Sequence, residues 1–248
     1  MEKELNCIWN KYIKLDWRFG LILLLVVCTM RFIFALHANV MGNYSLISYI
    51  MVFSALTPFI FLSKEGRKQI GMTKPNNYLW LLYSLFIGII LSTVLFLLGY
   101  FLYSTNIENW YVYIGNSYNI PEGIAGKDKL IYFSIMALTG MIFSPIGEEL
   151  FFRGIIHTSF SKSIGDKKAS IIDSSAFAIT HLSHFGIVYL SGIWKFLFIP
   201  SLIWMAGMFF SSLWFFRCRK KSGSIWGAVI CHAGFNLGMI FWIFYGLN

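Results

Sequence analysis

Long stretches of apolar residues recur along this chain, and they constrain its fold more than any other feature. An α-helix needs about 20 mostly apolar residues to cross a bilayer. Seven apolar runs span residues 17–36, 45–63, 78–103, 130–160, 169–182, 194–216 and 223–245. Only 12% of the 248 residues are charged, against about 25% in soluble domains. The sequence therefore excludes a water-soluble globule and predicts an all-α fold, a polytopic transmembrane helical bundle with about seven or eight spans.

Basic residues are concentrated in four segments that alternate with the predicted spans. Of the 20 Lys and Arg residues, 15 lie in residues 1–18, 64–77, 161–168 and 217–221. Membrane proteins retain Lys and Arg in their cytoplasmic loops, so topology explains the net charge of +9 without a nucleic-acid partner. We expect a multi-pass protein in the lipid bilayer of the cell membrane, with a cytoplasmic N-terminus and the C-terminus outside.

Ionisable and amide side chains that are candidates for a functional site occur inside three of the predicted spans. Such residues are costly in a membrane and generally face a cavity, a partner or a functional site. They are Glu148, Glu149 and Arg153 in the first of these spans, His181 in the second, and His232 and Asn236 in the third. Because buried polar groups require partners, their presence in otherwise apolar helices predicts one shared site.

Helical geometry separates the expected roles of these residues. Residues four apart share a helix face, so Glu149 and Arg153 are expected to form a structural pair. Glu148 points about 100° away from Glu149 and is left free for chemistry. By the same spacing, His232 and Asn236 project together from one helix.

Other polar residues in the spans are expected to be structural. Arg31 lies within the first run, where a long basic side chain commonly extends its charged end to the membrane surface; pairing with a carboxylate is the alternative. His157 and His184 are expected to be structural residues or to lie at the rim of the site.

A carboxylate, two imidazoles and a carboxamide suit amide hydrolysis by an activated water. The carboxylate can accept a proton from water, and the other groups can stabilise the developing oxyanion. Alternatively, Glu148, His181 and His232 could be the three ligands of an open catalytic zinc site, so the cofactor is either none or Zn. We favour the metal-independent reaction, because Asn236 beside His232 suits a donor pair and no evident carboxylate orients either histidine.

Three motifs in this order resemble those of a known family. They are EExxxR at residues 148–153, FxxxH at residues 177–181 and HxxxN at residues 232–236. Together they resemble the CAAX protease and bacteriocin-processing family, also called the Abi family of membrane endopeptidases. On this resemblance we divide the chain into N-terminal transmembrane helices with an outer loop, residues 1–129, and a catalytic transmembrane core, residues 130–248.

The resemblance implies an intramembrane endopeptidase with a cavity open toward the cytoplasm. It implies that Glu148 activates water, and that His181, His232 and Asn236 stabilise the oxyanion. Glu149 and Arg153 would support the site. The family includes enzymes described as metalloproteases and as metal-independent glutamate proteases, so the resemblance leaves the metal open.

The resemblance also implies a peptide or protein substrate in or at the membrane. Bacteriocin maturation, signal-peptide processing and self-immunity are the associated processes. Two other classes of function compete with proteolysis. One is a non-catalytic membrane immunity or scaffold protein that binds a peptide or partner. The other is an ion-coupled transporter, which the absence of a detectable inverted repeat makes the weaker interpretation.

Overall fold

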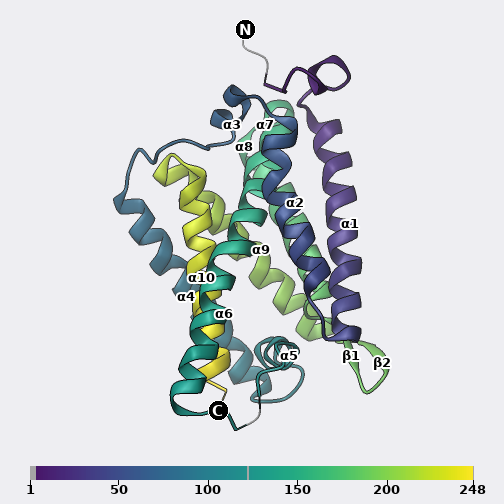
Figure 1. Cartoon of the computed structure of the whole chain (residues 1–248), viewed down its shortest axis with the longest axis vertical. Helices are drawn as coiled ribbons and strands as arrows, with labels where there is room; N and C mark the ends of the chain where they lie inside the picture. The colour runs from purple at the N-terminus through teal and green to yellow at the C-terminus, as the bar shows by residue number, and fades with distance from the viewer. Residues whose placement is uncertain (1–3, 122, 248) are drawn as a thin grey trace.

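The elements of the computed structural model run back and forth along the long axis of a helical bundle (Figure 1). The structure describes residues 4–121 and 123–247. The first half contains η1 (Trp9–Lys11), α1 (Trp17–Met41), α2 (Ser45–Phe61), α3 (Lys64–Gln69), α4 (Leu79–Tyr103) and α5 (Trp110–Ser117). The second half contains α6 (Gly126–Glu149), η2 (Leu150–Ile156), α7 (His157–Ile164), α8 (Asp166–Thr180), η3 (His181–Ser183), β1 (Ile187–Leu190), β2 (Ile193–Phe196), α9 (Phe198–Ser222) and α10 (Ile225–Tyr245).

Several helices have the length and composition of membrane spans. Within the described ranges, five segments qualify, namely α1, α4, the continuous helix Gly126–Ile164, α9 and α10. Helix α2, with 17 residues, is a shorter apolar helix. The predicted all-α bundle is therefore confirmed, and the chain is a multi-pass membrane protein. The number of seven or eight spans stays a prediction.

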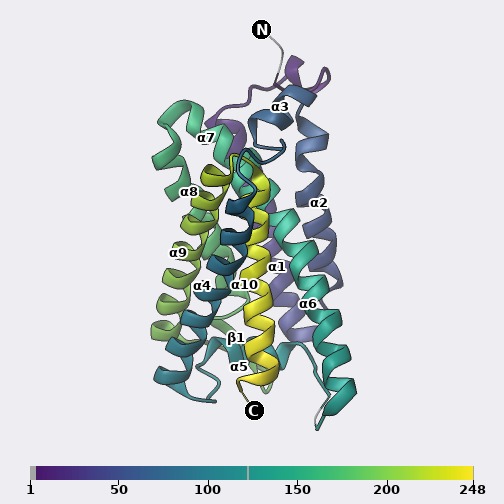
Figure 2. The ribbon, with the colours of Figure 1, turned by 90° about the vertical axis from the view of Figure 1, so that its left-hand side faces the viewer.

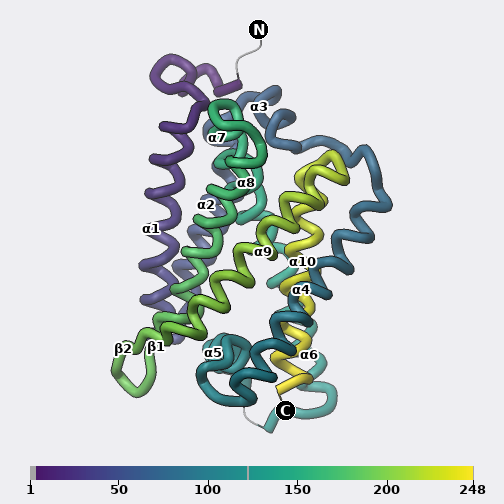
Figure 3. Tube along the Cα trace, turned by 180° about the vertical axis from the view of Figure 1, so that it is seen from behind, coloured from purple at the N-terminus to yellow at the C-terminus, as the bar shows by residue number. Residues whose placement is uncertain are grey.

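The predicted fifth run, residues 169–182, is only partly helical. Helix α8 has 15 residues and ends at Thr180, so His181 lies on the η3 turn and not within a helical span as expected. The chain then continues through β1 and β2 before α9 returns along the bundle (Figure 3).

The β1–β2 hairpin is a second difference, because we expected a span to begin at residue 194. Leu190 pairs with Ile193, and the two residues between them, Ser191 and Gly192, have φ values of 48° and 84°. Positive φ at both central residues is the geometry of a type I′ turn, which suits the twist of the flanking strands. This local turn forms a hairpin where hydropathy alone predicted a continuing helix.

Helices α4 and α10 lie side by side with their backbones in contact (Figure 2). A Cβ added to Gly88 would lie 1.9 Å from the carbonyl oxygen of Cys231, and one added to Gly234 would lie 2.2 Å from that of Leu85. Small residues allow membrane helices to approach this closely, and the resulting close packing favours helix association in lipid. The contact fixes α10, the helix that carries His232 and Asn236.

The basic segments gather at one end of the bundle, which we call the basic end. Lys162 forms an ion pair with Glu4, and Lys220 forms one with Asp166 at 3.0 Å. The described N-terminal segment, α3 and the α7–α8 junction lie together there, whereas α5 and the hairpin lie at the opposite end (Figure 1). We call the opposite end the α5 end.

Enlarging Gly88 should destabilise the bundle. A methyl group at this position meets the α10 backbone, which cannot rotate away, so we expect Gly88→Ala to cost about 1–3 kcal/mol as overpacked cores do. The measurement is the melting temperature in detergent. Val94→Ile adds a methyl to an exposed position of the same helix and should change little; equal melting temperatures for the two variants would contradict the close contact.

Candidate active site

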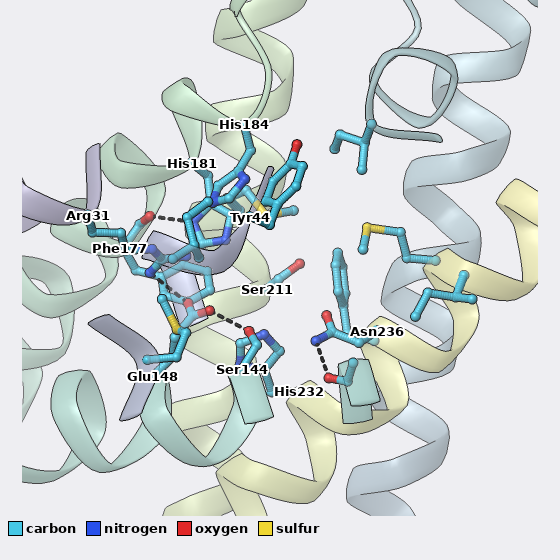
Figure 4. Close-up of a pocket in the computed structure, with 18 of the residues that line it drawn as sticks. Arg31, Tyr44, Ser144, Glu148, Phe177, His181, His184, Ser211, His232 and Asn236 are labelled. Atoms are coloured by element: carbon cyan, nitrogen blue, oxygen red, sulfur yellow. Dashed lines mark hydrogen bonds and ion pairs between the residues drawn. The ribbon is translucent and has the colours of Figure 1, made fainter. Parts of the chain in front are cut away.

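The four residues predicted for catalysis lie around one cavity of about 210 Å³. Glu148 is near the end of α6, His181 is on η3, and His232 and Asn236 are on α10 (Figure 4). The cavity is otherwise mainly apolar, with Met208, Phe215, Phe235 and Met239 among its lining residues. Folding thus brings together side chains that are up to 88 residues apart in the sequence.

Glu148 is engaged on both of its oxygens and is not free as the helix geometry suggested. Oε1 accepts a hydrogen bond from Ser144 Oγ at 2.5 Å, and Oε2 forms an ion pair with Arg31 Nη1 at 2.9 Å. The expectation that Arg31 reaches the membrane surface is therefore wrong, since only 4% of Arg31 is exposed.

Arg31 lies on the buried face of α1. The buried positions of α1 include Leu24, Val27, Arg31, Ala35 and Ala38, which recur at the spacing of a single helix face. Arg31 thus continues the stripe by which α1 faces the bundle. A charge on such a stripe needs an opposite charge from a neighbouring helix, and Glu148 supplies it.

Each of the two predicted histidines uses Nδ1 to hold its ring. His181 Nδ1 lies 2.7 Å from the carbonyl oxygen of Phe177, and His232 Nδ1 lies 2.7 Å from Glu149 Oε1. Since a carbonyl or carboxylate oxygen only accepts, Nδ1 donates in both contacts, and the neutral rings carry no proton on Nε2. The expected absence of an orienting carboxylate is wrong for His232, and with it goes one of our reasons for favouring a metal-independent reaction.

Glu149 and Arg153 form the expected ion pair, with 3.1 Å between Nε and Oε2, although the two atoms lack hydrogen-bond alignment. Arg153 is fully buried and lies over the Phe177 ring at 4.4 Å. Phe215 also contacts this guanidinium and stacks on the His232 ring at 4.8 Å. Arg153 therefore holds both Glu149 and the aromatic wall against which His232 rests.

The helix that supplies Glu148 and Glu149 changes its geometry directly after them. Residues Leu150–Ile156 form the π-helical segment η2, all of it buried. Pro145, one turn earlier, has no backbone N–H to donate within α6. Such π-helical insertions are frequent at functional sites, and here the segment directs Arg153 toward α8 and α9.

Asn236 lies across the cavity from Glu148 (Figure 4). Its Nδ2 donates to the carbonyl oxygen of Gly140 at 2.9 Å. This contact joins α10 to α6 and uses one of the two amide protons. The second proton is left for the donor role that the sequence predicted.

A second polar group lies toward the basic end and was not recognised from the sequence. His157 Nδ1 contacts the fully buried carboxylate of Asp173 at 2.8 Å. Ser174 Oγ donates to Asp173, and it accepts a hydrogen bond from Ser212 Oγ at 2.7 Å. A structural role was one of the two expected for His157, and Asp173, a carboxylate within the predicted run 169–182, was the signal for its partner.

The residues proposed as zinc ligands do not fit that role in this arrangement. In the described part of the chain, no three His, Cys, Asp or Glu side chains are grouped so as to hold a metal ion. Glu148, the expected oxygen ligand, is paired with Arg31, whose positive charge opposes a cation at the same carboxylate.

The sequence was compared with protein-family models, curated proteins and solved structures. Residues 130–238 match the model described as "Rce1-like: Type II CAAX prenyl endopeptidase Rce1-like". The match covers less than half of the chain, and it shows that this segment is similar to the Rce1-like family. No significant match was found among the curated proteins or among the solved structures.

The Rce1-like segment contains all six residues that the sequence predicted for catalysis or its support. The matched model describes an endopeptidase, which agrees with the resemblance drawn from the three motifs. Arg31 and Tyr44, which also line the cavity, lie outside the Rce1-like segment. Helices before residue 130 therefore complete the walls of the cavity.

Removing Arg153 should destabilise the protein. Arg153→Ala removes the buried arginine that is paired with Glu149, and breaking a buried ion pair costs about 3–5 kcal/mol in comparable sites. We expect a lower melting temperature in detergent and less protein in the membrane. Arg217→Ala, at an exposed arginine on α9, is the matched control. An unchanged melting temperature for Arg153→Ala would exclude a structural role.

Proposed function

We propose that this protein is an intramembrane endopeptidase of the CAAX type. It hydrolyses a peptide bond of a membrane-associated peptide or protein through a water activated by Glu148. The observation that carries this proposal is the convergence of Glu148, His181, His232 and Asn236 on one buried cavity. The similarity of residues 130–238 to an endopeptidase family supports it.

In the proposed reaction, Glu148 accepts a proton from a water that attacks the scissile carbonyl carbon. The proton then passes to the leaving amine. His232, held by Glu149, and His181, held by the Phe177 carbonyl, present Nε2 to the reacting groups. Asn236 offers an amide proton to the oxyanion. A mainly apolar cavity suits an apolar substrate side chain, and a bacteriocin precursor or a signal peptide is a substrate of this kind.

A non-catalytic immunity or scaffold protein is the second candidate, and a specific contact favours it. Arg31 neutralises Glu148, so the polar cluster is internally paired without a substrate. A structural role predicts that the neutral replacement of Glu148 leaves the function intact, whereas the protease predicts its loss.

The proposed orientation places the basic end in the cytoplasm, with the N-terminus inside and the C-terminus outside. Its support is the clustering of basic segments. The cavity is also lined by Ile114 and Ser117 of α5. In this orientation the cavity extends toward the outer face of the membrane, which differs from the cytoplasmic opening that the resemblance implied. The division into residues 1–129 and a catalytic core, residues 130–248, stays part of the proposal.

Labelling of single introduced cysteines in intact cells tests the orientation. We expect a membrane-impermeant reagent to label a cysteine at position 116, on α5, and to leave a cysteine at position 220 unlabelled until the cells are opened. The basis is the retention of Lys and Arg on the cytoplasmic side. Labelling of position 220 in intact cells would reverse the proposed orientation.

Glu148→Gln tests the protease directly. Loss of a general base typically lowers turnover by about 10²–10⁴-fold, so peptides released by the wild-type protein should be missing from cells that make the variant. Mass spectrometry of secreted and membrane-bound peptides identifies the substrate, and reconstituted protein then gives the rate. Turnover is expected to persist in chelator, because the site does not gather a metal-ligand set.

The matched control is Glu108→Gln, an exposed carboxylate next to α5. It should release the same peptides as the wild type. Melting temperatures establish that Glu148→Gln is folded. A folded Glu148→Gln protein that yields an unchanged peptide profile would reject the protease and favour the scaffold.

A further inference from the structure

Among the described residues that line the cavity, Arg31 is the one arginine, lysine or carboxylate that the motifs do not include. Only 4% of it is exposed, and its Nη1 donates to Glu148 Oε2 at 2.9 Å. Its Nε has no hydrogen-bond partner among the described residues. Of the buried side chains in that part of the chain that have a polar atom without a partner, Arg31 is the one that lines the cavity. Figure 4 shows Arg31 and Glu148 together on one side of the cavity.

The proposed hydrolysis transfers the negative charge from Glu148, the partner of Arg31, to the substrate oxygen. When water attacks, its oxygen bonds to the carbonyl carbon, and its proton goes to the Glu148 carboxylate. The carbonyl π electron pair moves to the substrate oxygen. Glu148 becomes neutral and the substrate oxygen becomes negative, so total charge is conserved. Arg31 is then a buried cation whose former partner has lost its charge, a state that is strongly unfavourable unless another anion is near.

The other donors around the cavity are less suited to hold this charge. Neutral His181 accepts at Nε2, because its proton is on Nδ1 against the Phe177 carbonyl. Asn236 gives one of its amide protons to Gly140. Arginine stays protonated throughout and carries five N–H donors, and the Nε–H of Arg31 has no acceptor.

We propose that Arg31 is the anion-binding group of the cavity, whose guanidinium holds a negatively charged substrate oxygen in the reactive complex. The inference rests on the proposed function for its role in turnover. The charged oxygen has two sources, the tetrahedral oxyanion and a carboxylate at the C-terminus of the substrate. Either anion would replace Glu148 as the partner of the positively charged Arg31 guanidinium.

Binding of a matched pair of probes tests the anion site without requiring hydrolysis. The probes are N-acetyl-leucyl-phenylalanine with a free carboxylate and the same dipeptide as its C-terminal amide, titrated by calorimetry into the full-length protein in detergent. In Glu148→Gln the cation is uncompensated, so this variant should bind the acid about tenfold or more tightly than the amide. Wild-type protein should show a smaller preference.

The double variant Arg31→Gln/Glu148→Gln provides the decisive control. It replaces a buried ion pair by two neutral amides and thereby avoids the unpaired carboxylate of Arg31→Gln alone. It should bind acid and amide equally. Absence of a preference for the acid in folded Glu148→Gln, or its persistence in the double variant, would overturn the proposal.

Kinetics with the peptide found by mass spectrometry separates the two sources of the anion. If Arg31 holds the oxyanion, Arg31→Lys lowers kcat by about tenfold or more for both the C-terminal acid and the C-terminal amide of that peptide. If it holds the terminal carboxylate, amidation of the peptide raises KM in the wild type and has a smaller effect in Arg31→Lys, which keeps the charge and loses the planar set of N–H donors. Arg18→Lys, at an exposed arginine on the same helix, should match the wild type.

The two arms distinguish failure of this inference from failure of the proposed function. A protein that cleaves no peptide, yet binds the acid through Arg31, would lack the protease activity and keep the anion site. A protein that cleaves its peptide at the wild-type rate and with the wild-type KM after Arg31→Lys, with no acid preference in Glu148→Gln, would be a protease without an anion site at Arg31.

Discussion

Two consecutive carboxylates are neutralised by two different arginines, and the candidate site depends on this division. Glu148 pairs with Arg31 of α1, whereas Glu149 pairs with Arg153 on its own helix. Charges inside a membrane protein are tolerated only when paired. The two carboxylates therefore point to different parts of the bundle and have different roles. Glu148 faces the cavity, and Glu149 holds His232 from behind.

The pairing also explains why the N-terminal helices belong to the site. The family match begins at residue 130, but the counter-charge for Glu148 comes from α1. Without α1, Glu148 would be an unpaired carboxylate among apolar helices, a state that costs several kcal/mol. The three motifs all lie after residue 129, but the candidate site also requires a residue from before it.

The sequence predicted what depends on composition and local spacing. Apolar runs identified the long membrane helices, and the four-residue spacing identified the Glu149–Arg153 pair. It did not predict contacts between helices far apart in the chain, such as those of Arg31 and Asp173, because their partners are set by packing. Hydropathy also failed to predict the β1–β2 hairpin. Its apolar residues resemble the start of a membrane span, and the turn depends on the backbone conformation of Ser191 and Gly192.

The polar groups next to the cavity hold His232 in position, and their chemistry excludes a proton relay. Glu149 holds His232, Arg153 holds Glu149, and Ser212 links Arg153 through Ser174 to α8. Proton transfer along this series of contacts would require the Arg153 guanidinium to release a proton, which arginine does not do in proteins. Its fixed planar donors hold the partners in place instead. The Nε2 atom of His232 is thereby aimed by contacts that extend to the packing of α8 against α9.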